Sequence, residues 1–190
     1  ERKDFLQTIA ECAETPSKFS EIFLDHDVFD YNKKYVDCKD RFIVYRSGRQ
    51  VGKTMSTAVK AIHFAFFAPL MLKTVKHECT IVIAAPTQNQ AGIMFDRIRG
   101  LVMRNKFLRG YVVRNTQTEL WVNFLDNTGM SKIITRATGE HGTTLRGYSP
   151  HCIIADECSF IKTDILRAFL PSGMATLARV WLTSTPFSKS

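Results

Sequence analysis

The chain has 190 residues, of which 45% are hydrophobic, and its 14 phenylalanines can fill the core of one domain. A formal net charge of +8 favours a polyanionic partner such as nucleic acid, although a basic surface without such a partner is the alternative. The longest apolar run, AIHFAFFAPLML, is too short to span a bilayer, and no signal peptide is visible, so we expect neither membrane insertion nor secretion.

The first part of the chain, residues 1–40, predicts a segment of mixed helix and loop that is interrupted at Pro16 and packs on the core. From residue 41 to residue 190 the pattern becomes regular. Short apolar runs rich in β-forming residues alternate there with longer helical patterns. We therefore expect residues 41–190 to form the principal domain.

Four apolar runs in this domain are typical of buried strands: FIVY (42–45), CTIVIAAP (79–86), CIIADE (152–157) and RVWLTSTP (179–186). YVVR (111–114) and LWVNF (120–124) predict a hairpin, and KIITRAT (132–138) predicts a further strand. Helices are expected over 53–67, ending near Pro69, over 87–103 with Thr87 as cap, and over 165–170, ending at Pro171. This alternation indicates an α/β fold whose mostly parallel sheet is covered by helices on both faces.

The stretch YRSGRQVGKT joins the first strand to the first long helix and predicts a phosphate-binding loop. Ser47 stands where the first glycine of the usual pattern belongs, but Gly48 and Gly52 still permit close approach of the backbone. Backbone N–H groups at the helix start would bind phosphates, Lys53 would reach the outer ones, and Thr54 can ligate Mg²⁺. A chance match at a helix cap is the alternative.

The acidic strand end IIADE (153–157) is the second feature that carries chemistry. Asp156 at the tip of a buried strand suits coordination of Mg²⁺, and Glu157 can polarise the attacking water as a general base. Alone, such a string is equally typical of a solvated strand end. Its position after a phosphate loop in an alternating α/β chain favours the catalytic interpretation.

The stretch LTSTP (182–186) ends the last predicted strand in small hydroxyl residues. Thr183, Ser184 or Thr185 could sense the γ-phosphate at the carboxyl end of the sheet, where ligands bind in such folds. A strand that simply ends at Pro186 explains the local pattern equally well.

Two further stretches are rich in glycine or arginine. GEHGTTLRG (139–147) places Arg146 on a glycine-containing loop that could approach another surface, or that is a plain turn. RIRGLVMRNKFLRGYVVR (97–114) holds six basic residues and no acidic one, so it predicts either a track for a phosphate backbone or a solvated basic face. The six are Arg97, Arg99, Arg104, Lys106, Arg109 and Arg114.

Taken in order, RQVGKT, APTQNQA, GTTLRG, IIADE and TSTP resemble the ATPase domain of viral terminase large subunits, the motors that package double-stranded DNA. The resemblance covers about residues 41–186 and implies a P-loop NTPase domain of the ASCE, RecA-like type. It implies that ATP and Mg²⁺ are the cofactors and that the reaction is ATP hydrolysis driving DNA translocation into a procapsid.

The resemblance also implies roles for individual residues. Glu157 would be the catalytic carboxylate, Arg49 a cis-acting arginine, and Arg146 a candidate trans-acting arginine finger for a neighbouring subunit. Thr54 and Asp156 would hold Mg²⁺. By the same resemblance, Thr183 to Pro186 would form the coupling motif that links hydrolysis to movement. The loop residues that would bind nucleotide are Ser47, Gly48, Arg49, Gln50, Val51, Gly52, Lys53 and Thr54, with Thr185 from the coupling motif.

The partners implied by the resemblance are double-stranded DNA, a portal protein, a small terminase subunit, and further copies of this chain in a ring, with a monomer possible in isolation. The family's C-terminal nuclease has no counterpart in these 190 residues, so we do not expect this chain to cut DNA. Five cysteines, an odd number without a C-x-x-C pair, argue against disulfides and favour the host cytoplasm.

Two other functions stay open at this point. A superfamily 1 or 2 helicase core also combines a G-K-T loop, an acidic strand end and a hydroxyl-rich third motif. A non-hydrolysing nucleotide-binding or DNA-binding assembly module is the other alternative, but such a module has no need of a water-activating carboxylate such as Glu157.

Overall fold

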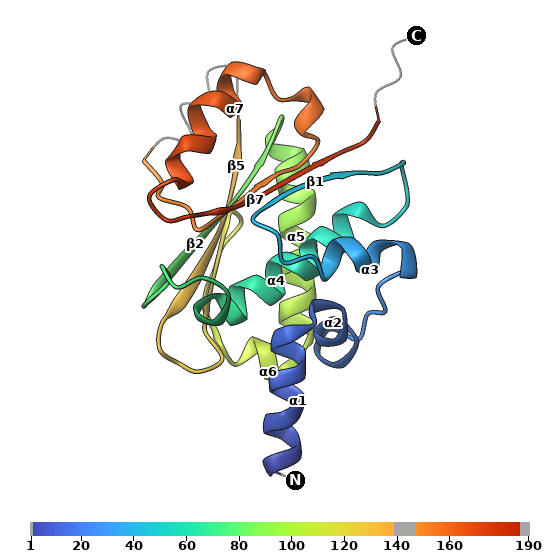
Figure 1. The fold of residues 1–190 in the computed structure, drawn as a ribbon, viewed down its shortest axis with the longest axis vertical. Coiled ribbons are helices and arrows are strands. Elements are labelled where there is room, and N and C mark those ends of the chain that lie inside the picture. The colour runs from blue at the N-terminus through green and yellow to red at the C-terminus, as the bar shows by residue number, and fades with distance from the viewer. Residues whose placement is uncertain (1, 139–146, 187–190) are drawn as a thin grey trace.

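A computed structural model describes residues 2–138 and 147–186 (Figure 1). Its centre is a seven-stranded sheet with the order β1-β7-β6-β2-β5-β4-β3. The strands are β1 (Phe42–Arg46), β2 (Glu78–Ala85), β3 (Val112–Asn115), β4 (Glu119–Asn123), β5 (Met130–Ala137), β6 (Cys152–Ala155) and β7 (Arg179–Ser184). The five strands from β1 to β5 in this order are parallel, whereas β4 and β3 extend the sheet antiparallel to β5. The mostly parallel sheet and the hairpin predicted from the sequence are confirmed.

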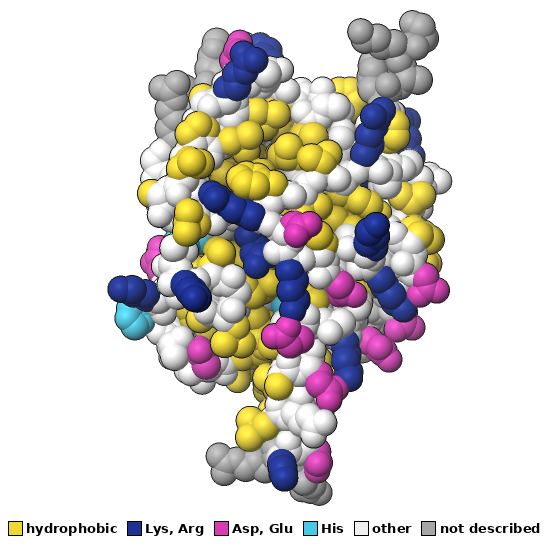
Figure 2. Space-filling model, in the orientation of Figure 1, with side chains coloured by type: hydrophobic (Ala, Val, Ile, Leu, Met, Phe, Trp, Pro, Cys, Tyr) yellow, Lys and Arg dark blue, Asp and Glu magenta, His cyan; other side chains and the backbone are white. Residues whose placement is uncertain are grey.

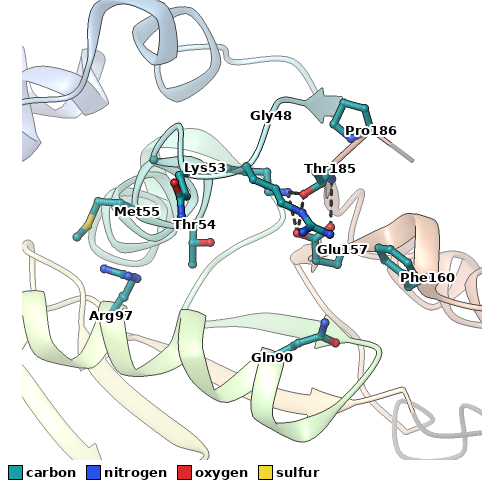
Figure 3. A pocket seen from close by; sticks show the side chains of 13 residues that line it. Gly48, Lys53, Thr54, Met55, Gln90, Arg97, Glu157, Phe160, Thr185 and Pro186 are labelled. Atoms are coloured by element: carbon teal, nitrogen blue, oxygen red, sulfur yellow. Dashed lines mark hydrogen bonds and ion pairs between the residues drawn. The ribbon is translucent and has the colours of Figure 1, made fainter. Parts of the chain in front are cut away.

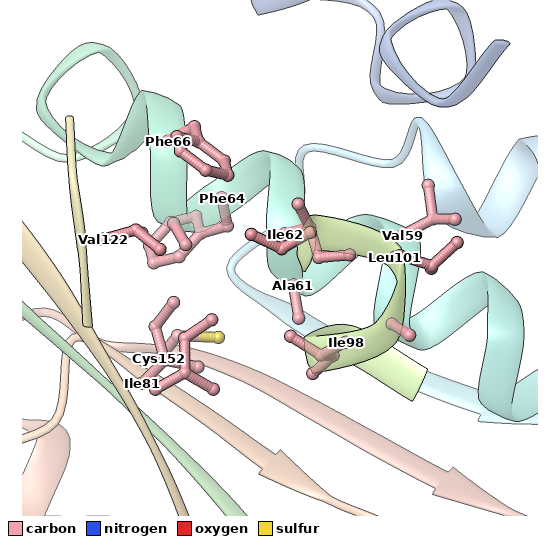
Figure 4. Packing of buried hydrophobic residues seen from close by; sticks show 14 of the residues in the cluster. Val59, Ala61, Ile62, Phe64, Phe66, Ile81, Ile98, Leu101, Val122 and Cys152 are labelled. Carbon is pink, nitrogen blue, oxygen red and sulfur yellow. The ribbon is translucent and has the colours of Figure 1, made fainter. Parts of the chain in front are cut away.

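Helices cover both faces of this sheet, as predicted. The α-helices are α1 (Arg2–Glu14), α2 (Pro16–Leu24), α3 (Asp30–Val36), α4 (Lys53–Met71), α5 (Gln88–Arg104), α6 (Lys106–Arg109) and α7 (Thr163–Phe169). On β2, Ile81 and Ile83 belong to the main core, in which residues of α4 and α5 pack (Figure 4). Val82 and Ala84 belong to the second core, in which residues of α7 pack. Because successive side chains of a strand point to opposite faces, burial on both faces makes β2 a continuous apolar run.

Helix α4 extends through Pro69 to Met71, slightly past the end expected from the sequence. Proline has no N–H, so within a helix it leaves the carbonyl oxygen four residues earlier without its usual donor. Here the Ser131 hydroxyl donates to the carbonyl oxygen of Ala65 at 2.6 Å. A side chain of β5 thus satisfies the group that Pro69 cannot, and the helix continues.

The three helices that precede β1, namely α1, α2 and α3, pack on α4. Phe19 of α2 is fully buried in the main core. At the end of α3, the buried Lys60 ammonium donates to the carbonyl oxygens of Val36 at 2.8 Å and Cys38 at 2.5 Å. Burial lowers the pKa of Lys60 to about 8. These contacts tie the end of α3 to α4.

Strand β1 lies at the edge of the sheet and exposes apolar side chains. Phe42 and Val44 are 62% and 74% exposed, and apolar side chains gather between β1 and α7 on the face shown in Figure 2. The expectation of a buried strand at 42–45 is therefore wrong for these two residues, because β1 is an edge strand that is covered on one face only. Among the described residues, no helix has the length and apolarity that crossing a membrane would require.

Candidate nucleotide site

The loop between β1 and α4 has the backbone geometry that a phosphate cradle needs. Gly52 adopts φ +79°, and Gln50 is also left-handed at φ +62°. A Cβ at position 52 would lie 3.2 Å from Asn32 Nδ2 and 3.3 Å from the Phe29 ring. Glycine is therefore required at position 52 both by conformation and by space. The first residues of α4, a 19-residue helix, line the cavity beside the loop, and the N-terminus of a helix favours a phosphate there.

A side chain from α3 supports this loop from behind. Asn32 is fully buried, and its Nδ2 donates to the carbonyl oxygen of Val51 at 2.8 Å. The Tyr45 hydroxyl of β1 donates to Asn32 Oδ1, and the Tyr45 ring stacks on Tyr35 with 4.0 Å between centroids. Nothing in the sequence signals this support, because Asn32 lies well outside the loop motif and is an ordinary polar residue of a short helix.

Lys53 connects the loop to both of the other motifs predicted from the sequence, the acidic strand end IIADE and the hydroxyl-rich stretch LTSTP. Its Nζ donates to Glu157 Oε1 at 2.9 Å and to Thr185 Oγ1 at 2.8 Å (Figure 3). The Thr185 hydroxyl donates to Glu157 Oε1 at 3.0 Å, and the Thr185 N–H donates to Glu157 Oε2 at 3.1 Å. Three segments far apart in the sequence thus converge at the carboxyl ends of β1, β6 and β7.

Glu157 also has an unusual backbone conformation. Its backbone is left-handed, with φ +48°, which is uncommon for a residue other than glycine. Burial on its own raises the pKa of Glu157, but the hydrogen bonds from Lys53 and Thr185 outweigh it and bring the pKa below its ordinary value. The carboxylate is therefore ionised at neutral pH and able to accept a proton.

Asp156 directly follows β6 and is more buried than Glu157. It is 6% exposed, and its Oδ1 accepts a hydrogen bond from the Thr183 hydroxyl at 2.6 Å. Burial raises the pKa of Asp156, and the hydrogen bond from Thr183 opposes this shift. The carboxylate of Asp156 and the hydroxyl of Thr54 are hard oxygen donors of the kind that Mg²⁺ prefers. Within the described residues, no group of three or more His, Cys, Asp or Glu could hold a metal, so phosphate and water would supply the other ligands.

A cavity of about 590 Å³ connects these groups. The residues predicted as site residues that line it are Gly48, Arg49, Gln50, Gly52, Lys53, Thr54, Glu157 and Thr185. Ser47, Val51 and Asp156 lie behind the lining, and the Ser47 N–H donates to the carbonyl oxygen of Ser184 at 3.2 Å. Arg146 lies outside the described residues.

Helix α5 forms one wall of the cavity, and nothing in the sequence indicated this role. Gln90 and Arg97 are the residues of α5 that line the cavity. The sequence offered Arg97 only as part of a DNA-backbone track or a solvated basic face, whereas the structure places it at the cavity beside the loop (Figure 3).

The sequence model of one protein family, described as "Terminase large subunit, T4likevirus-type, N-terminal", matches residues 44–190. The chain belongs to this terminase large subunit family. The resemblance drawn from the motifs is thereby confirmed. The comparison with curated proteins found no match.

Solved terminases share the fold. The large terminase ATPase domain of Thermus phage P74-26 has a TM-score of 0.76 and 22% identity, covering 93% of this chain and 72% of that one. The large terminase of bacteriophage HK97 has a TM-score of 0.72 and 18% identity, covering 91% of this chain and 37% of that one. A large terminase of a thermophilic bacteriophage, in complex with ADP, has a TM-score of 0.56 and 13% identity, covering 75% and 33%. These terminases confirm the RecA-like P-loop NTPase fold.

Proposed function

We propose that this terminase domain hydrolyses ATP with Mg²⁺ and that hydrolysis drives translocation of double-stranded DNA. The observation that supports this most directly is the contact of Lys53 with Glu157 and Thr185 across one cavity. A phosphate-binding lysine, a water-activating carboxylate and a strand-end hydroxyl are the groups that P-loop hydrolysis requires. The ADP complex of a related terminase is consistent with a nucleotide as ligand.

Each residue of the cavity has a separate role in the proposed hydrolysis. Bound Mg²⁺ would neutralise phosphate charge, and Thr54 and Asp156 are the residues that would hold it. Lys53 would exchange its contact with Glu157 for one with the outer phosphates. Glu157, still held by the Thr185 N–H at 3.1 Å, could then accept a proton from the attacking water. Arg49 lies on the loop itself, where the resemblance implies a cis contact with the phosphates.

Phosphate release tests this proposal. Purified protein with ATP and Mg²⁺ is expected to release phosphate, and EDTA is expected to stop the release because Thr54 and Asp156 then have no metal to position. A coupled phosphate assay, with Lys53→Ala protein from the same preparation as background, measures it. ATP binding without release would favour the non-hydrolysing module, and absence of nucleotide binding would refute the proposal.

The family match favours a packaging motor over the helicase alternative, because the matched region includes all the motifs of the site. By the family resemblance, the portal protein, the small terminase subunit and a ring of copies are the proposed partners. The trans role of Arg146 stays a prediction, which complementation between Arg146→Ala and Glu157→Gln subunits would test.

The end of α5 and helix α6 are the proposed contact with DNA. Of the six basic residues between 97 and 114, Arg99 pairs with Asp96 at 2.8 Å and Arg114 with Glu119 at 3.7 Å. Arg104 at the end of α5 and Lys106 and Arg109 in α6 are exposed. These three side chains are therefore better placed than the others to meet a phosphate backbone.

Binding to duplex DNA is expected to be independent of sequence and to weaken steeply with salt, because cations on the protein displace counterions from the DNA. Arg109→Ala should reduce the slope of log affinity against log salt by about 1. Fluorescence anisotropy at several salt concentrations, with two unrelated duplexes, measures both. A flat salt dependence or a strong preference for one duplex would contradict the proposal.

A further inference from the structure

Helix α5 brings a cation to the nucleotide cavity from the side opposite the phosphate loop. Arg97 lines the same cavity as Lys53 and Thr54, although it lies on a separate helix. Gln90 also lines it and lies seven residues earlier on α5, so both side chains project from one face of the helix.

Arg97 is not neutralised by a carboxylate within the described part of the chain. Its acidic neighbour Asp96 pairs instead with Arg99, whose Nη2 lies 2.8 Å from Asp96 Oδ1. In the same cavity, the charge of Lys53 is already countered by Glu157 at 2.9 Å. Arg97 therefore adds positive charge to a cavity whose other walls are suited to a polyanion.

The position of Arg97 along the cavity indicates which part of the nucleotide it meets. Figure 3 shows Arg97 on the side of Thr54 and Met55, whereas Gln90 lies toward Glu157 and Phe160. Seven residues of helix span about 10 Å, so Arg97 is well removed from the carboxylate that would activate water. The phosphate that is cleaved must lie near Glu157, and the phosphates that remain on the nucleoside lie further along.

We propose that Arg97 binds the non-transferred phosphates of the nucleotide, and that it contributes to affinity for ATP and ADP alike. The inference rests on the proposed function, since it takes a nucleotide to be the ligand of this cavity. A guanidinium can donate two parallel hydrogen bonds to phosphate oxygens, which an ammonium cannot reproduce with the same geometry. Because these phosphates change little during hydrolysis, Arg97 is a binding residue and not an arginine finger.

The test is the affinity of Arg97→Ala for ATP and for ADP, each with Mg²⁺, measured by calorimetry. Loss of a charge-assisted contact is expected to raise both dissociation constants by the same factor, about tenfold or more. Arg97→Lys should recover part of the affinity. In turnover assays KM should rise while kcat stays the same, as expected when uniform binding is removed. Lys76→Ala, which removes a positive charge from the exposed loop before β2, is the matched control and should bind as the wild type does.

Several outcomes would overturn the inference. Unchanged nucleotide affinity in Arg97→Ala would do so, and so would weaker affinity for ATP with unchanged affinity for ADP, or a lower kcat. A variant that binds nucleotides normally but loses affinity for duplex DNA would assign Arg97 to the DNA surface instead. If the wild-type protein itself binds neither ATP nor ADP, the proposed function fails, and this result is distinct from a failure confined to Arg97.

Discussion

Replacing Glu157 with glutamine is expected to lower ATP hydrolysis by about 10²-fold or more while leaving nucleotide binding at least as tight as in the wild type. Glutamine retains the shape of the side chain but cannot take a proton from water. It also removes the ion pair in which Glu157 Oε1 lies 2.9 Å from Lys53 Nζ, so Lys53 no longer has to leave a charged partner to meet phosphate. Structure and chemistry thus predict opposite effects on binding and on turnover.

The companion variant Lys53→Ala should fail in the other way, because it removes the cation that meets the phosphates and should lose nucleotide binding. Titration with a fluorescent nucleotide and a phosphate-release assay measure the two quantities. Asp164→Asn, which neutralises an exposed carboxylate on α7, is the control for a general loss of negative charge. Equal loss of binding in Glu157→Gln and Lys53→Ala would remove Glu157 from the proposed role.

Much of the fold follows from patterns that are local in the sequence. The strands β2, β6 and β7 could be predicted because burial on both faces makes most of their residues apolar. The loop before α4 could be predicted because its glycines and Lys53 occur at a fixed spacing. Asp156 and Glu157 could be placed at the carboxyl end of the sheet for the same reason, since they follow the buried strand β6 directly.

What could not be predicted depends on contacts between distant segments. Asn32 supports the loop through the carbonyl oxygen of Val51, a contact that exists only because α3 packs behind β1. Arg97 belongs to a run of basic residues whose members face different directions once α5 is folded, and only the packing of α5 decides that this one lines the cavity. Likewise, a side chain at position 52 would collide with Phe29 and Asn32, and neither of these residues belongs to the loop motif.

The buried His63 of α4 is expected to make the protein lose stability as the pH falls below neutrality. His63 is 1% exposed, and its Nε2 lies 2.9 Å from the carbonyl oxygen of Cys12 in α1, so Nε2 carries the proton. Its Nδ1 is buried without a partner among the described residues. Protonation would place a charge on that unsatisfied nitrogen, in a region that already holds Lys60. Burial accordingly lowers the pKa of His63 to about 4.

The sign of the effect follows from the two states of His63. Well above pH 6.5 the imidazole is neutral whether the protein is folded or unfolded, and it causes no dependence on pH. Between about pH 6.5 and 4 the unfolded chain binds a proton that the folded protein does not, so the free energy of unfolding falls as the pH is lowered. The expected loss from this group is about 2 kcal/mol between pH 7.5 and 5, and it reaches about 3 kcal/mol at pH 4.

Urea unfolding at pH 7.5, 6 and 5 measures this loss in the wild type and in His63→Gln. Glutamine can still donate to the carbonyl oxygen of Cys12 but does not titrate, so this variant should show a smaller fall in stability between pH 7.5 and 5 even if it is less stable at both. His77→Gln, at an exposed imidazole in the loop before β2, is the matched control. If His63→Gln and the wild type lose the same free energy over this range, the acid sensitivity comes from other groups. A smaller loss in His63→Gln alone would instead identify the contact between α1 and α4 as the place where acid destabilises the domain.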